Sequence, residues 1–292
     1  MSAVNIGRKK VSEFNRTLFA WHKNNFRGMD WRNTRDPYCI LVSEIMLQQT
    51  QVARVTEKYA EFLNKFPTAK KLAAAPLGDV LTVWSGLGYN RRAKFLHNCA
   101  KEVVINYGGK FPVTFESLVK LPGIGISTAG ALLAFSFGQD TPMIDTNIRR
   151  ILVRVFFKKN IPSDKELYAF ASSIIPKGKG REWNYAMLDL GATLCTARNH
   201  SHHDLECPLS RLHGKVDDFI YKKPQKNFAG SDRFYRGKIL KALTEKGSES
   251  QLEIMKQLSE YKGNKIQIIQ ILERLLKEGM IVKKANKYRL PK

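Results

Sequence analysis

Apolar side chains recur at helical spacing in the segments of this chain that stand out most clearly. Asp36-Pro37 is typical of an N-cap followed by a first helical position, and the apolar helix that they predict runs on through Ser43–Leu47. Two more apolar, helix-forming stretches meet at Leu121–Gly125, and another apolar helix follows Asp145. The pattern therefore predicts a mainly α protein.

The segment 229–292 has a pattern of its own. Three apolar groups at helical spacing predict three helices, and a hairpin follows them with its turn at Ala285-Asn286. We therefore expect a small winged-helix-like domain at 229–292, joined by a linker at 222–228 to a larger domain at 1–221. The apolar groups are Ile239, Leu240 and Leu243; Leu252, Ile254 and Leu258; and Ile268, Ile271, Leu272, Leu275 and Leu276.

Glu44 is the most informative residue of the predicted helix near the N-terminus. It lies among Ile45, Met46 and Leu47, and the amide and hydroxyl side chains of Gln48–Gln51 follow. Desolvation raises the pKa of a carboxyl group, so Glu44 could hold a proton near neutral pH. A buried glutamate satisfied by neighbouring backbone is the structural alternative.

The segment Leu121-Pro122-Gly123-Ile124-Gly125 predicts a tight turn between two helices. Two glycines around one apolar residue leave backbone N–H groups facing outward at the start of a helix, where the helix dipole favours an anion. This frame is typical of a helix-hairpin-helix element, which contacts a DNA backbone without reading its sequence.

Asp145 is positioned to cap the helix that begins in Asp145-Thr146-Asn147. A carboxylate at a helix N-terminus is favoured in its ionised form and can stabilise a cation beside it. Together, a protonatable Glu44, a DNA-binding hairpin and an ionised Asp145 predict cleavage of a glycosidic bond in DNA, after the base has been flipped out of the duplex.

These motifs resemble the helix-hairpin-helix (HhH-GPD) DNA glycosylases, and within them the MutY-type adenine glycosylases. The resemblance covers about residues 10–213 and implies a two-lobed helical glycosylase domain. It implies that Glu44 protonates the adenine, that Asp145 stabilises the sugar cation and that Asn147 orders the catalytic water. It also implies that Gln49, Thr50, Leu87 and Tyr89 contact DNA near the orphan base, and that Gly123, Gly125 and Ser127 belong to the DNA-binding hairpin.

Ser127 occupies the position at which bifunctional relatives such as endonuclease III carry a catalytic lysine. A serine cannot form a Schiff base with the sugar. We therefore expect a monofunctional enzyme that removes the base and leaves the strand intact.

The chain departs from the family in the region where most members bind a [4Fe–4S] cluster through four cysteines. Only Cys195 and Cys207 lie there, with Asp204 and His213 at the other aligned positions, so we expect no iron–sulfur cluster. His200, His202, His203 and His213 make zinc chemically possible, but we favour a polar loop without a cofactor. Cys39 and Cys99 lie in apolar helical stretches, and we expect no disulfides.

Composition adds a strong electrostatic signal. A net charge of +23 predicts a polyanionic partner, and segment 229–292 alone has 15 Lys and Arg against 7 Asp and Glu. We expect a monomer that binds double-stranded DNA with a mismatched or damaged base. We expect no membrane span or signal peptide, which predicts a cytoplasmic, nucleoid-associated protein.

Three functions remain open at this point. The Gln48–Gln51 tract favours excision of adenine opposite guanine or 8-oxoguanine. The family's usual 8-oxoguanine-reading domain does not fit in the C-terminal segment, so a thymine or uracil glycosylase acting opposite guanine is the second hypothesis. The third is a non-catalytic winged-helix DNA-binding or regulatory protein. Independently of the function, segment 229–292 could serve only to pack on the larger domain.

Overall fold

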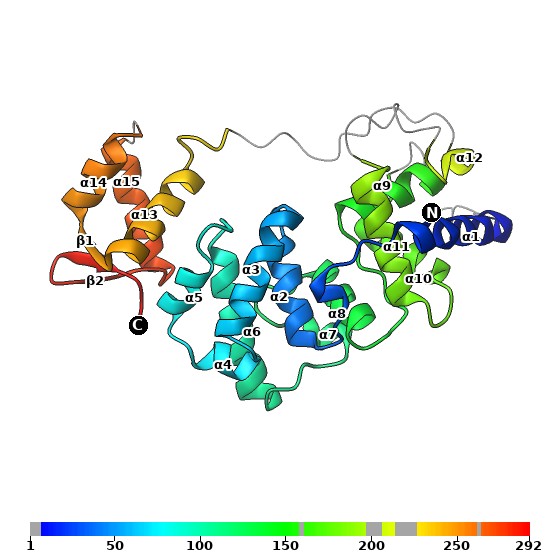
Figure 1. The fold of residues 1–292 in the computed structure, drawn as a ribbon, viewed down its shortest axis with the longest axis horizontal. Helices are drawn as coiled ribbons and strands as arrows, with labels where there is room; N and C mark the ends of the chain where they lie inside the picture. The colour runs from blue at the N-terminus through cyan, green and yellow to red at the C-terminus, as the bar shows by residue number, and fades with distance from the viewer. Residues whose placement is uncertain (1–6, 158–160, 197–205, 214–226, 262–263) are drawn as a thin grey trace. The chain divides into compact units, whose positions relative to one another are not determined.

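The computed structural model describes residues 7–157, 161–196, 206–213, 227–261 and 264–292. These residues are mainly helical, as the sequence predicts, with one small sheet near the C-terminus (Figure 1). The chain forms two compact units, each assembled from separated stretches. The first unit contains residues 1–40, 113–120 and 124–223, and the second contains 41–112, 121–123 and 224–292.

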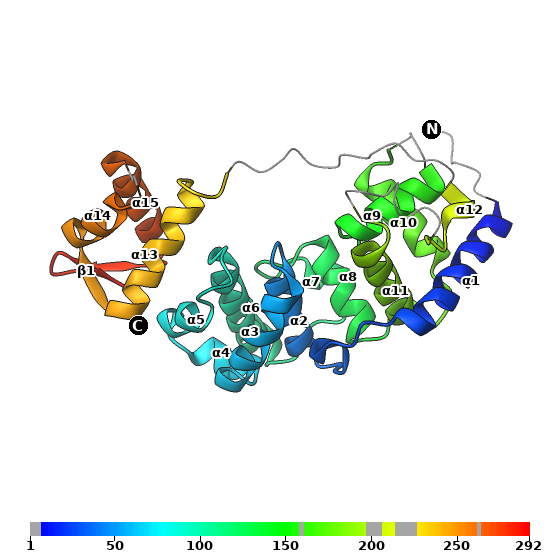
Figure 2. The ribbon, with the colours of Figure 1, turned by 45° about the horizontal axis from the view of Figure 1, so that its top comes forward.

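The first unit is built around α11, on which α1 packs (Figure 2). The buried Trp183 of α11 donates its ring N–H to Asn15 of α1, and the ring of Phe14 contacts that of Phe156 at 5.0 Å. The elements of this unit are α1 (Arg8–Asn25), η1 (Asp30–Arg32), α7 (Phe115–Leu118), α8 (Ile126–Phe135), α9 (Thr146–Leu152), η2 (Val153–Phe157), α10 (Asp164–Ile174), α11 (Gly180–Thr193) and α12 (Ser210–His213).

The apolar helix predicted after Asp145 is not uniform. Its regular part, α9, ends at Leu152, and Val153–Phe157 continue as the π-helical segment η2. The wider turn carries Phe156 between Phe14 and Phe170, with ring centroids 5.0 and 4.9 Å away. Periodicity did not indicate this change because π-helical turns differ from α-helix by a single residue.

The second unit begins within α2 (Pro37–Leu47), at Leu41. Its core includes Phe62 and Trp84, whose rings meet edge to face with centroids 5.9 Å apart. Cys99 is buried and Cys39 is half-buried. The remaining helices of this part are α3 (Val52–Lys65), α4 (Ala69–Ala74), α5 (Leu77–Val83) and α6 (Arg91–Tyr107).

Residues 227–292 form a module that contains the three predicted helices and the predicted hairpin. Its elements are α13 (Asp232–Lys246), β1 (Ser248–Ser250), α14 (Gln251–Ser259), α15 (Lys265–Lys277), β2 (Val282–Lys284) and β3 (Lys287–Arg289). The strands pair antiparallel in the order β1-β3-β2, and Ala285 and Asn286 turn the hairpin with φ of 46° and 62°. This order of elements resembles a winged helix.

Two details of this module differ from the prediction. The strand β1 was missed because Ser248-Glu249-Ser250 has no apolar residue to mark it. Leu252 was assigned to the apolar group of the second helix, but it is 77% exposed. The capping box of Ser250 and Glu253 fixes the start of α14 one residue before Leu252, which places that side chain outside the core.

The C-terminal module packs on α5 and α6 within the second unit. The N–H of Gly78 donates to the carbonyl of Pro291 at 2.8 Å, and a Cβ at Gly78 would lie 2.3 Å from that oxygen. Glu278 forms ion pairs with Arg91 of α6 and with Arg236 of its own module. Only glycine permits this approach of the chain end to α5.

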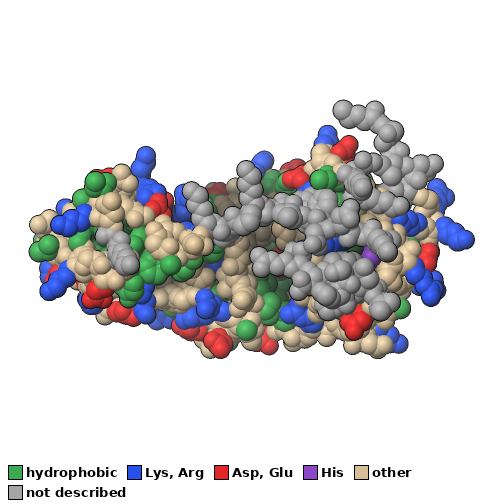
Figure 3. Space-filling model, turned by 90° about the horizontal axis from the view of Figure 1, so that it is seen from above, with side chains coloured by type: hydrophobic (Ala, Val, Ile, Leu, Met, Phe, Trp, Pro, Cys, Tyr) green, Lys and Arg blue, Asp and Glu red, His purple; other side chains and the backbone are tan. Residues whose placement is uncertain are grey.

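Lysine and arginine side chains are spread over the face shown in Figure 3, with acidic side chains between them. The basic charge of this face is therefore not confined to one patch. None of the described helices is long and apolar enough to cross a membrane.

Candidate active site

Asp145 caps α9, as the sequence predicts. Its Oδ1 accepts from the backbone N–H of Asn147 at 2.9 Å and of Ile148 at 2.8 Å. The side chain of Asn147 also hydrogen-bonds to this carboxyl group. Asp145 and Asn147 are therefore brought together at one helix N-terminus, with the carboxyl group of Asp145 oriented by three donors.

The segment leading into this cap is held by α11 and α8. Asn184 of α11 accepts from the N–H of Met143 at 2.9 Å and donates to the carbonyl of Thr141 at 2.9 Å. A Cβ at Gly130 of α8 would lie 2.3 Å from the carbonyl oxygen of Pro142. The backbone before Asp145 is thus fixed from two sides.

Asn147 is held by contacts with α11 and with Arg150 of its own helix. A Cβ at Gly191 would lie 2.5 Å from Asn147 Cβ, so glycine is needed for α11 to pack here. Arg150 donates from Nη2 to Asn147 Oδ1 and to the carbonyl of Gly191, both at 2.8 Å. Because Oδ1 accepts from Arg150, the amide Nδ2 of Asn147 is oriented toward other acceptors.

Burial adds an electrostatic cost at Asp145 that the sequence did not show. Burial raises the pKa of Asp145 above its ordinary value, although the backbone donors and the charge of Arg150 act in the opposite direction. The predicted helix N-terminus is present, and its backbone donors favour the ionised form. Desolvation was not visible in the sequence, and it makes the ionised carboxylate costly to maintain.

Glu44 lies near the end of α2 in the second unit. Asp36 begins this helix as predicted, because its Oδ1 accepts from the N–H of Tyr38 at 2.7 Å and of Cys39 at 3.2 Å. Ile45 and Met46 beside Glu44 are 2% and 0% exposed, whereas Glu44 itself is half-buried rather than buried. Its carboxyl group is therefore close to apolar side chains and still reachable by a ligand.

Arg92 of α6 organises the backbone that follows Glu44. Its guanidinium bridges the end of α2 to the loop before α6 through six hydrogen bonds of 2.5–3.2 Å. Their acceptors are the carbonyls of Ile45, Met46, Gln48, Leu87 and Gly88 and the hydroxyl of Thr50. Burial lowers the pKa of Arg92 to about 10, which leaves it cationic at neutral pH. One buried cation thus neutralises the C-terminal end of the α2 dipole.

Replacing Arg92 with methionine should destabilise the protein by at least ~3 kcal/mol, because several buried carbonyls lose their donor. Urea unfolding monitored by circular dichroism would measure this. Lys101→Met provides the control, since Lys101 is exposed on the same helix. Equal stability of the two variants would contradict the organising role of Arg92.

The predicted contacts of the orphan-base region meet in one pocket of the second unit. Gln49, Thr50, Leu87 and Tyr89 all line it. Tyr89 is 38% exposed, whereas Leu87 is 3% exposed and is therefore packed in the interior rather than accessible to a ligand. Gln49 and Tyr89 have φ of 58° and 47°, a left-handed conformation that is strained for residues other than glycine and that is concentrated at functional sites.

The predicted hairpin is present between α7 and α8. Gly123 has φ of 79°, and a Cβ there would lie 2.7 Å from Phe95 Cβ, so the turn requires glycine. Gly125 is the N-cap of α8, and Ser127 is the second residue of that helix. Gly123 and Gly125 are exposed, which leaves the N-terminus of α8 open to an anion.

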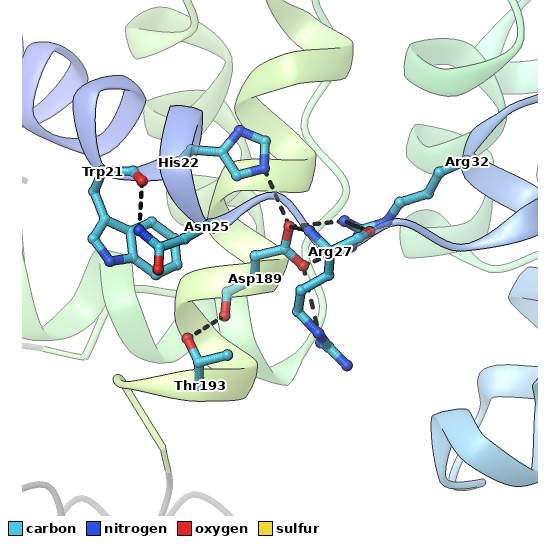
Figure 4. Close-up of polar contacts among 7 residues, drawn as sticks. All are labelled: Trp21, His22, Asn25, Arg27, Arg32, Asp189 and Thr193. Carbon is cyan, nitrogen blue, oxygen red and sulfur yellow. Dashed lines mark hydrogen bonds and ion pairs between the residues drawn. The ribbon is translucent and has the colours of Figure 1, made fainter.

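Asp189 anchors the N-terminal part of the chain to α11, the helix that supports Asp145. Its side chain is fully buried, and Figure 4 shows His22, Arg27 and Arg32 converging on it. Arg32 donates through both terminal nitrogens at 2.7 and 2.8 Å, and His22 Nε2 lies 3.1 Å away. Burial acts to raise the pKa of Asp189, but the hydrogen bonds from His22 and Arg32 outweigh it and the pKa is lowered.

Asp189→Asn should reduce the free energy of unfolding by ~3–5 kcal/mol at neutral pH, because it leaves the buried Arg32 without its counter-ion. The lowered pKa means that this stabilisation is present at neutral pH and is lost as the pH falls through it. Asp164→Asn is the control, because it removes an aspartate–arginine ion pair at the surface: Asp164 is 81% exposed and pairs with Arg149. This substitution should cost ~1 kcal/mol or less of the free energy of unfolding. Similar losses in both variants would contradict the anchoring role.

Comparison with known proteins agrees with this geometry. Residues 42–177 match the model of the HhH-GPD superfamily of base excision DNA repair proteins. The adenine DNA glycosylase of Mycolicibacterium smegmatis is 35% identical over 279 residues, covering 92% of each chain. That of Mycobacterium tuberculosis strain H37Rv is 36% identical over 246 residues, covering 81% of this chain and 80% of the relative.

The chain belongs to the adenine DNA glycosylase family. The fold agrees, because the structure of a thermostable thymine-DNA glycosylase superposes with a TM-score of 0.66 at 30% identity, covering 70% of this chain and 95% of that one. The predicted two-lobed helical glycosylase fold is therefore confirmed. The assigned roles of individual residues stay predictions.

The cysteine region does not fit the iron–sulfur cluster of most family members. Cys195 Sγ accepts from Arg154 at 3.2 Å, and Cys207 Sγ lies 3.7 Å from His213 Nε2. The other two cysteines, Cys39 and Cys99, lie in α2 and α6, so four thiolates are not supplied here.

The part of the chain that the structure describes gives no support for a zinc site either. His200, His202, His203 and Asp204 lie outside the described residues. Within the described ranges, no group of three or more Cys, His, Asp or Glu side chains is arranged to hold a metal ion.

Sequence reasoning missed Arg92 and the cluster around Asp189. Arg92 could have been noticed as a cation on the same helical face as Leu96 and Cys99, both of which are buried. Asp189 gave no comparable signal, because its partners come from positions more than 150 residues earlier.

Proposed function

We propose that this chain is a monofunctional glycosylase that removes adenine mispaired with guanine or 8-oxoguanine in double-stranded DNA. Family membership makes it a DNA N-glycosylase rather than a non-catalytic binding protein. The observation that carries the catalytic assignment is Asp145, whose carboxyl group is oriented by three donors at the N-terminus of α9.

The chemistry divides between two carboxyl groups. Glu44 gives its proton to the adenine ring, and the N-glycosidic bond breaks with its electron pair leaving on the base. The sugar is left as an oxocarbenium ion, which the ionised Asp145 stabilises. Water then adds to the sugar carbon and gives its proton to the Glu44 carboxylate, which restores the acid. Asn147 helps to orient that water.

Ser127 supports cleavage of the glycosidic bond alone. It lies at the start of α8, where it can contact a phosphate but cannot attack the sugar as an amine would. The hairpin residues Gly123 and Gly125 would bind the DNA backbone beside it. The net charge of +23 suits this partner.

Three further features belong to the proposal. The chain would act as a monomer without an iron–sulfur cluster or zinc. It would consist of a glycosylase domain at 1–221, a linker at 222–228 and a DNA-binding or packing domain at 229–292. It would act in the cytoplasm on the nucleoid, because its substrate is chromosomal DNA.

A second candidate substrate is thymine or uracil opposite guanine. The fold similarity to a thermostable thymine-DNA glycosylase, at 30% identity, favours it specifically. The two candidates share the scaffold and the carboxyl groups, and they differ in the pocket for the flipped base.

A glycosylase assay separates them. The duplexes carry A opposite G, A opposite 8-oxoguanine, T opposite G, or U opposite G, and alkali reveals abasic sites. Release of adenine alone would support the proposal, and release of thymine or uracil alone would replace it with the second candidate. Strand cleavage before alkali would contradict the monofunctional assignment of Ser127.

A further inference from the structure

The pocket that contains Gln49 and Tyr89 has walls from two distant parts of the second unit. One wall is the loop after α2 together with the loop before α6, and the other is the start of α13 in the C-terminal module. Its volume of about 580 Å³ lies within the ~300–1,000 Å³ usual for small-ligand pockets. The lining residues of the C-terminal module are Phe228, Arg233, Arg236 and Gly237.

The lining has the chemistry of a nucleotide site. It contains five arginines and no acidic residue, which favours a ligand rich in acceptors and close to phosphates. It also contains three glutamines and Asn90, whose amides can donate and accept. Phe228 and Tyr89 are 60% and 38% exposed and offer aromatic faces for stacking.

Among the arginines, Arg233 is the best placed to meet a base. Arg91 and Arg236 both pair with Glu278. Arg92 donates to backbone carbonyls, and Arg54 of α3 donates to the carbonyl of Gly86 at 3.4 Å. The guanidinium of Arg233 lies over Phe228 at 6.0 Å and over Tyr89 at 5.6 Å, and it donates to the Tyr89 hydroxyl at 2.6 Å. Arg233 is therefore oriented by two aromatic side chains that themselves line the pocket.

The same contacts connect the C-terminal module to the backbone near Glu44. Tyr89 lies between Arg233 and Arg92, whose guanidinium is 5.4 Å from the ring. Arg92 in turn holds the end of α2 and the Gln48–Thr50 backbone. A base that enters the pocket would thus contact residues that are positioned together with the predicted acid.

The family resemblance places the base opposite the excised adenine beside Gln49 and Tyr89, and we propose that Arg233 of the C-terminal module determines the specificity for that base. Arg233 donates to O6, the acceptor shared by guanine and 8-oxoguanine, whereas cytosine presents an amino donor that a guanidinium cannot accept. The proposal deepens the proposed function and rests on it. It assigns to a winged-helix-like module a role in reading the opposite base.

The test compares Arg233→Ala with wild type on duplexes that carry adenine opposite guanine, 8-oxoguanine or cytosine. The measured quantity is the single-turnover rate of adenine release divided by Kd. The preference for guanine and 8-oxoguanine over cytosine should fall about 5- to 100-fold, the value of one good base contact. Arg233→Lys should restore overall affinity but not the full preference, because an ammonium lacks the planar fork.

Lys241→Ala is the matched control for loss of one charge. Lys241 lies on the same helix, is 61% exposed and pairs only loosely with Glu245 at 3.5 Å. This variant should leave the preference unchanged. A thermal unfolding curve for each variant checks that the module remains folded.

A double-mutant cycle identifies the atom that is read. Guanine is replaced with 2-aminopurine, which lacks O6, in combination with Arg233→Ala. If Arg233 contacts O6, each change alone reduces release and the two together cost little more than one. Additive losses would overturn the contact.

The outcomes separate this proposal from the function on which it rests. Wild-type protein that releases no adenine from any duplex refutes the proposed function. Wild-type protein that prefers guanine or 8-oxoguanine, with the same preference in Arg233→Ala, leaves the function standing and refutes the role of Arg233. An equal loss on all three duplexes also refutes it, because that is the behaviour of a phosphate contact.

Discussion

Glu44→Gln should reduce the rate of adenine release by about 10²- to 10⁴-fold, because glutamine keeps the shape of the side chain and cannot donate the proton that the leaving base needs. Binding to the duplex should remain nearly unchanged, since the phosphate contacts are elsewhere. A single-turnover assay measures the rate, and fluorescence anisotropy with a non-cleavable substrate analogue measures the binding.

Glu57→Gln is the control for this substitution. Glu57 is exposed on α3, so the same substitution there leaves the predicted acid untouched. Excision by Glu44→Gln at the wild-type rate would remove Glu44 from the mechanism. A parallel loss of DNA binding would instead indicate that this residue positions the duplex.

Asp145→Asn should reduce adenine release by about 10²- to 10³-fold while leaving the protein as stable as wild type or more stable. Asparagine caps a helix as well as aspartate does, so the start of α9 is preserved. Because burial raises the pKa of Asp145, the ionised form opposes folding at neutral pH, and the neutral amide removes that cost. Kinetics and thermal unfolding of the same preparation test both parts.

The pH profile gives a second check on Asp145. Catalysis needs the carboxylate, so the rate should fall on the acid side at a higher pH than an ordinary aspartate would give. Asp145→Ala serves as the contrast, because it should lose activity and also about 1 kcal/mol of stability with the cap. An Asp145→Asn variant that is destabilised to the same extent would show that the residue is mainly structural.

Local signals in the sequence were sufficient to predict the helix starts and turns around the candidate site. Asp36, Asp145 and Ala285-Asn286 each act through residues within three positions of themselves, and the structure places each as predicted. Gly123 was likewise predicted from a frame of five residues. These features depend on backbone geometry that a few neighbouring residues determine.

Long-range contacts were not predictable in the same way. Asp189 is held by His22 and Arg32, and the pocket joins Tyr89 to Arg233, so each pair is separated by more than 140 residues. Burial depends on such contacts as well, which is why neither the burial of Leu87 nor the desolvation of Asp145 could be predicted. The spacing of residues along the chain indicates neither the long-range contacts nor the burial of a side chain.

The bond between Arg32 and Asp189 also bears on the order in which the chain acquires structure during synthesis. The helix α1 emerges first, but Arg32 obtains its counter-ion only when α11 has left the ribosome. Residues 41–112, in contrast, are a continuous stretch whose helices can pack on one another at once. We therefore expect the N-terminal segment to remain unfolded, and accessible to chaperones and proteases, while residues 41–112 fold before it.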